Sequence, residues 1–167
     1  LFTARVLNKY DVGYHQCSEC GLIQTETPYW LDEAYDHPIS PLDVGYVSRN
    51  IVNVRRATRL IESSFDETAS FLDYGAGYGL FVRMMRDAGF DFYGSDKYCE
   101  SLFAPYFTLE RQTIESKAPF ELVSAFEVFE HITDPLDQIS TLLDISDSVL
   151  CTTELVPRST LTGTEYW

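Results

Sequence analysis

Hydrophobic residues follow a repeating strand-then-helix order from about residue 47 to residue 153. Apolar positions at helical spacing predict three helices, over 47–64, 80–88 and 134–144. Short apolar runs predict the strands between them, over 69–73, 91–95, 121–126 and 148–153. This alternation is typical of an α/β fold, so we expect a Rossmann-like, doubly wound and mostly parallel sheet with helices on both faces.

The remaining segments have weaker patterns. Residues 98–104 suit a short helix, and residues 106–109 suit a third strand in chain order. Residues 1–45 combine many aromatic side chains with scattered turn formers, so we expect a small irregular N-terminal segment there. These patterns divide the chain into an N-terminal segment with a linker, residues 1–45, and a core domain, residues 46–167.

Charge and composition narrow the possible partners. The chain of 167 residues carries a formal charge of −14, which disfavours binding to nucleic acids because their phosphates attract basic surfaces. Four arginines in the first helix have the spacing of a solvated helix face, which we prefer to an anion site: Arg49, Arg55, Arg56 and Arg59. We find no apolar run that could span a bilayer and no secretory signal, so we expect a cytoplasmic protein without membrane partners.

A glycine-rich loop between a strand and a helix is the strongest chemical signal. The run from Asp73 to Gly79 reads Asp-Tyr-Gly-Ala-Gly-Tyr-Gly, and glycine lets a ligand approach the backbone closely. The helix that follows directs its N–H groups and positive dipole end at the ligand. Asp96 follows the next strand, at a position where an acid can accept hydrogen bonds from ribose hydroxyls. The glycine-rich loop and Asp96 together predict a cofactor that contains a nucleoside.

The kind of cofactor follows from the residues on either side of the glycines. Leu80 stands where a dinucleotide fingerprint needs a third glycine or alanine, which weakens an NAD interpretation. Asp73 would repel a diphosphate, but it could hold an amino group. The chain also has no phosphate-binding loop of the nucleotidase type, so a cationic nucleoside is the better match.

The segment after the strand at 121–126 adds aromatic and acidic groups. Phe126, Glu127 and Phe129 could surround a sulfonium centre. His131 is either a general base for the reaction or a histidine at a helix end that bonds to the backbone.

Together, these motifs resemble those of class I S-adenosylmethionine-dependent methyltransferases over about residues 47–155. The chain is similar to the small-molecule branch, which includes ubiquinone-type and sugar methyltransferases. The resemblance implies that S-adenosylmethionine binds at Asp73, Tyr74, Gly75, Gly77, Gly79, Asp96, Lys97, Thr113, Ile114, Phe126 and Glu127. Family members continue into two further strands, so we expect a fragment whose sheet lacks its C-terminal strands.

A single cysteine pair, Cys17 and Cys20, forms half of a zinc-ribbon pattern. His15 or His37 could complete a metal site. Related sugar methyltransferases have another such pair upstream, which implies that the intact protein could bind zinc.

The sequence therefore predicts a methyltransferase that acts by in-line displacement on a small-molecule or sugar-related acceptor. One alternative is a catalytically incomplete module that binds the cofactor or a partner. The other is an NAD-dependent oxidoreductase, which the substituted third glycine disfavours.

Overall fold

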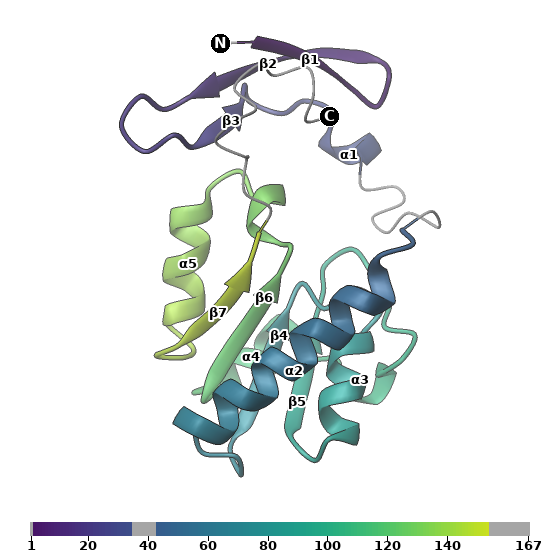
Figure 1. The fold of residues 1–167 in the computed structure, drawn as a ribbon, viewed down its shortest axis with the longest axis vertical. Helices are drawn as coiled ribbons and strands as arrows, with labels where there is room; N and C mark the ends of the chain where they lie inside the picture. Colours follow the sequence, from purple (N-terminus) through teal and green to yellow (C-terminus); the bar gives the residue numbers. More distant parts are fainter. Residues whose placement is uncertain (1, 35–42, 154–167) are drawn as a thin grey trace. The chain divides into compact units, whose positions relative to one another are not determined.

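The computed structural model describes residues 2–34 and 43–153, which form two separate compact units (Figure 1). Among these residues, no helix combines the length and apolar character needed to cross a bilayer.

The N-terminal unit is a small antiparallel sheet, and the expectation of an irregular segment was wrong. Its strands are β1 (Phe2–Val6), β2 (Tyr10–Gln16) and β3 (Ile23–Thr25), in the order β1-β2-β3. A short helix, α1 (Leu31–Ala34), follows. Val12, Tyr14 and Trp30 form the buried core of this unit, because alternate residues of β2 point to the same face of the sheet.

The second unit contains a parallel sheet of four strands in the order β5-β4-β6-β7. These strands are β4 (Ser70–Tyr74), β5 (Asp91–Ser95), β6 (Leu122–Phe126) and β7 (Val149–Thr152). All four were predicted from short apolar runs, and the Rossmann-like α/β fold is confirmed. Because the strands are parallel, their carboxyl ends all lie at one edge of the sheet.

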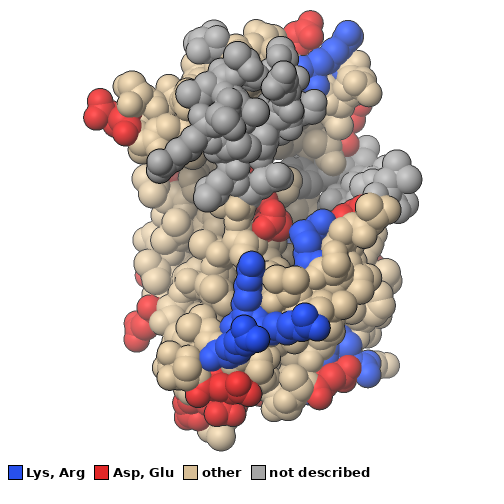
Figure 2. Space-filling model, viewed as in Figure 1, with Lys and Arg blue, Asp and Glu red and all other residues tan. Residues whose placement is uncertain are grey.

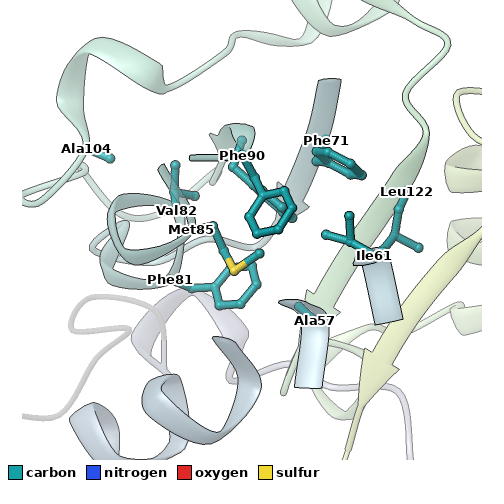
Figure 3. Close-up of a cluster of buried hydrophobic side chains, with 10 residues drawn as sticks. Ala57, Ile61, Phe71, Phe81, Val82, Met85, Phe90, Ala104 and Leu122 are labelled. Atoms are coloured by element: carbon teal, nitrogen blue, oxygen red, sulfur yellow. The ribbon is translucent and has the colours of Figure 1, made fainter. Parts of the chain in front are cut away.

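Two helices, α2 (Tyr46–Ser64) and α3 (Leu80–Asp87), pack on one face of this sheet. Figure 3 shows Phe71 and Leu122 of the sheet beside Ala57 and Ile61 of α2. The apolar stripe of α2 that the sequence predicted is thus the surface that meets the sheet. Residues of α3 close the other side of this cluster: Phe81, Val82 and Met85.

The other face is covered by α4 (Arg111–Lys117) and α5 (Pro135–Leu143). Leu72 and Val123 point to this face and pack against Ile114 of α4 and Leu142 of α5. Helix α5 begins as expected, since the Asp134 side chain accepts the Asp137 N–H and proline occupies the first turn.

Two predictions between β5 and α4 were wrong. The segment 98–104 forms no helix, and the segment 106–109 forms no regular strand. A single turn of 3-10 helix spans Pro105–Phe107, and only Thr108 makes an isolated parallel bridge, to Gly94. Helix α4, which follows this segment, was not among the predicted helices.

Candidate functional site

The glycine loop lies at the carboxyl edge of the sheet, between the end of β4 and the start of α3. Gly75, Gly77 and Gly79 have φ angles of +70°, +55° and +78°, a region that side chains with a Cβ rarely adopt. The sequence therefore places glycine at each position where the chain makes this sharp turn.

Close packing adds a second constraint on this loop. A Cβ at Gly75 would lie 2.6 Å from Cγ2 of Val128, which follows β6. A Cβ at Gly79 would overlap the hydroxyl of Ser101. The loop is thus pressed against two neighbouring segments, and larger residues would push it away from both.

Asp96 joins the glycine loop to the end of β5. Its Oδ2 accepts the Gly77 N–H at 2.8 Å, and its Oδ1 accepts the N–H groups of Tyr98 and Cys99, both at 2.8 Å. These three bonds occupy most of the acceptor capacity of a carboxylate. A small pocket lies beside them and is lined by Ala76, Gly77, Gly79, Val82, Gly94, Ser95, Asp96, Cys99, Ser101, Ala104 and Thr108.

Asp73 lies beneath the same loop, with only 3% of its surface exposed. Ser124 of β6 donates its hydroxyl to Asp73 Oδ1 at 2.6 Å. Burial raises the pKa of the Asp73 carboxyl to about 7, and the charge of Asp96 adds to this, while the Ser124 hydroxyl opposes it. Asp73 is therefore a carboxyl group that a bound cation would help to ionise.

The end of β6 carries a strained acidic residue. Glu127 has a φ of +55°, a left-handed conformation that is uncommon for residues other than glycine. Its Oε1 accepts the Thr152 hydroxyl at 2.7 Å, and its N–H bonds to the Thr152 carbonyl at 3.0 Å. These contacts fix the carboxylate at the sheet edge. Phe126, just before it, packs edge-on against Phe81 at 4.8 Å between ring centres.

His131 ends a turn of 3-10 helix, Phe129–His131, which begins two residues after Glu127. Its N–H bonds to the Val128 carbonyl. Burial raises the pKa of the neighbouring Glu130 carboxyl, and Glu127 raises it further through charge and a hydrogen bond. The segment thus holds two carboxyl groups and an exposed imidazole within five residues, and its Val128 packs against the glycine loop.

Four further predicted residues have side chains that point into solvent or to other parts of the fold. Tyr74 donates its hydroxyl to Gln138 of α5, on the face away from α3. Ile114 is buried in the core against the sheet, and Thr113 beside it is exposed on α4. Lys97 is exposed, with its ammonium group 5.1 Å from the centre of the Tyr98 ring.

The cysteine pair lies in the other unit, in the turn between β2 and β3. Cys17 and Cys20 are both exposed, and backbone N–H groups of Cys20 and Glu19 lower the pKa of the Cys17 thiol. Within residues 2–34 and 43–153, no third histidine, cysteine or acidic side chain gathers with them as a metal site would need. His37 falls outside the described residues.

Tyr46 was not singled out by the sequence. It begins α2, and its ring meets that of Tyr78 in the glycine loop edge-on, at 6.3 Å. Burial raises the pKa of Tyr46, the charge of Asp73 adds to this, and the N–H groups of Leu80 and Tyr78 oppose it. The phenol therefore faces the N-terminus of α3. The sequence did not indicate this placement, because helical periodicity alone explains a tyrosine at this position.

Comparison with known proteins identifies the family of this fold. The family model described as a methyltransferase domain matches residues 47–160, which include the glycine loop, Asp96 and the segment after β6. No curated protein matches the chain.

Proposed function

Because the chain belongs to the methyltransferase domain family, whose cofactor is S-adenosylmethionine, we propose that it methylates a small hydroxylated or sugar-related acceptor. One observation carries the cofactor site in this proposal: Gly77 of the glycine loop donates its N–H to Asp96, and the buried Asp73 precedes the same loop at the end of β4. Loop and acids thus form one unit at the edge of the sheet where nucleoside ligands bind in open α/β folds.

The chemistry of these groups fits a cationic nucleoside. Asp73 is a buried carboxyl with a raised pKa, so an ammonium group nearby would offset the cost of ionising it. Asp96 would accept hydrogen bonds from the ribose hydroxyls. These bonds would either replace those from the backbone N–H groups that Asp96 accepts now or form beside them. Gly75 already packs against Val128, so the methionine end would have to meet the backbone of the loop on another side. A dinucleotide would instead bring a diphosphate toward Asp73.

The residues of the chain would act mainly by orientation. When bound, S-adenosylmethionine supplies an electrophilic methyl group on a positively charged sulfur. An acceptor oxygen held in line would form a bond to that methyl carbon as the carbon–sulfur bond breaks, and alignment would supply most of the acceleration. Phe126 and Glu127 would flank the reacting centre, and His131 would take the proton of the acceptor hydroxyl.

Methyl transfer is tested by incubating the chain with S-adenosylmethionine labelled in its methyl group and a panel of hydroxylated acceptors. We expect label in an acceptor and release of S-adenosylhomocysteine above the rate without acceptor. Cofactor binding without transfer to any acceptor would instead favour a catalytically incomplete binding module.

A further inference from the structure

A second cavity, of about 240 Å³, opens between the first half of α2 and the carboxyl ends of β6 and β7. This volume is below the usual range for small-molecule pockets, which begins at about 300 Å³, so only a small ligand would fit. Its lining is polar apart from one valine: Ser48, Arg49, Val52, Asn53, Arg56, Glu127 and Thr152.

This cavity adjoins the glycine loop. Glu127 lines the cavity, and the next residue, Val128, is the one that Gly75 packs against. A molecule in the cavity would therefore reach the same sheet edge as the loop. That is where a methyl acceptor has to lie for in-line attack.

Asn53 is the least expected residue in this lining. It lies on the buried stripe of α2 with only 8% of its surface exposed. Its amide makes no hydrogen bond with another described residue, and among the described residues no fully buried side-chain nitrogen or oxygen lacks a partner. The Asn53 amide is therefore open to the cavity, where a polar ligand could bond to it.

The charges of the lining indicate the sign of that ligand. Arg49 forms an ion pair with Asp43, whereas Arg56 makes no ion pair with any described residue. Figure 2 shows Lys and Arg side chains gathered over α2, in a chain whose formal charge is −14. Most of the surface of so acidic a chain repels anions. The guanidinium of Arg56, which no described acid neutralises, would instead attract an anion to this cavity.

We propose that this cavity binds the methyl acceptor, and that the acceptor is a small hydroxylated molecule with a carboxylate or phosphate group held by Arg56 and Asn53. A guanidinium matches both anions with two parallel hydrogen bonds. Glu127 stands in the same lining and would accept a bond from a hydroxyl of the acceptor. The acceptor role rests on the proposed methyltransferase function, whereas the anion site itself does not.

The test follows the arginine Nε–Hε signals of the full ¹⁵N-labelled chain by NMR, with and without S-adenosylhomocysteine. Three probes of similar size are titrated: glucuronate, glucose 6-phosphate and neutral glucose. We expect both anions to shift the Arg56 signal while glucose does not. Arg56→Gln should weaken anion binding about tenfold, because it removes a charge-assisted hydrogen bond.

Arg59→Gln is the matched control, since Arg59 is exposed on the same helix but outside the cavity. Equal shifts with glucose, or equal weakening in both variants, would overturn the proposal. Binding of S-adenosylhomocysteine in the same samples separates the two claims. Its failure would count against the proposed function, whereas its success without anion binding would count against this inference alone.

Discussion

Ser124 of β6 donates its hydroxyl to the Asp73 carboxylate of β4 at 2.6 Å, in the interior beneath the glycine loop. Both side chains are almost fully buried. The bond links two neighbouring strands at the point where the sheet meets its candidate cofactor site. It favours the ionised carboxylate, but burial is the larger effect and raises the pKa of Asp73 to about 7.

This raised pKa makes stability depend on pH. Between about pH 4 and pH 7 the folded chain holds a proton on Asp73 that the unfolded chain has lost, so the free energy of unfolding falls as pH rises. In the wild type, Asp73 should lower the free energy of unfolding by roughly 4 kcal/mol over this pH range, and we expect Asp73→Asn to abolish this decrease. Urea unfolding of both proteins at several pH values measures it. Asp144→Asn, which removes an exposed carboxyl group, is the control variant. Parallel profiles for wild type and Asp73→Asn would contradict the assignment.

Gly75→Ala should destabilise the fold through two effects. The new Cβ would have to adopt a φ of +70° and would press on Val128. Gly89→Ala is the matched control, because Gly89 has a φ of +101° with open space around it. We expect a loss of about 1 kcal/mol at Gly89 and a larger loss at Gly75. Adding Val128→Ala to Gly75→Ala should recover only the steric part. Thermal unfolding measures all four proteins, and equal losses at the two glycines would refute the packing argument.

At position 127, a glycine variant should be more stable than an alanine variant, whereas alanine is usually the more stabilising of the two residues. Both Glu127→Gly and Glu127→Ala lose the bond from Thr152, but only alanine keeps the strain of a φ of +55°. We expect the glycine variant to be more stable by about 1 kcal/mol, measured by urea unfolding. Methyl transfer should fall in both variants. A more stable alanine variant would mean that the left-handed conformation costs nothing.

His131→Gln should lower kcat by roughly 100-fold if the imidazole takes the acceptor proton. S-adenosylhomocysteine affinity should be unchanged, since Asp73 and the glycine loop are untouched. His15→Gln in the N-terminal unit is the control. An unchanged kcat, once an acceptor is known, would assign His131 to the structural role of ending the 3-10 turn.

The core of the fold could be predicted because its physical signals are local. Four apolar runs became the four parallel strands, and Asp134 with Pro135 marked the start of α5. The N-terminal sheet was not predicted because the tight turn between β1 and β2 contains no glycine or proline to signal it. Leu7 and Asn8 occupy this turn instead, both with a φ of +54°. The alternation of Tyr10, Val12 and Tyr14 was the available signal.

The errors after β5 have a common cause in side chains that bond to the backbone. Asp96 captures the N–H groups of Tyr98 and Cys99, and such local bonds compete with helix formation. Pro105 then begins a 3-10 turn in place of a strand. The same reliance on periodicity overlooked the buried Asn53, which lies on α2 between Arg49 and Arg56 and lines the proposed anion site.

The most direct test of the central claim is a calorimetric titration of the chain with S-adenosylmethionine, S-adenosylhomocysteine and NAD, repeated on Asp96→Asn. We predict binding of the first two at one site, no binding of NAD, and affinity at least tenfold weaker in the variant, because Asp96 would hold the ribose and shape the loop. Binding of NAD in place of S-adenosylmethionine, or equal affinity in Asp96→Asn, would contradict the assignment of this loop as the cofactor site.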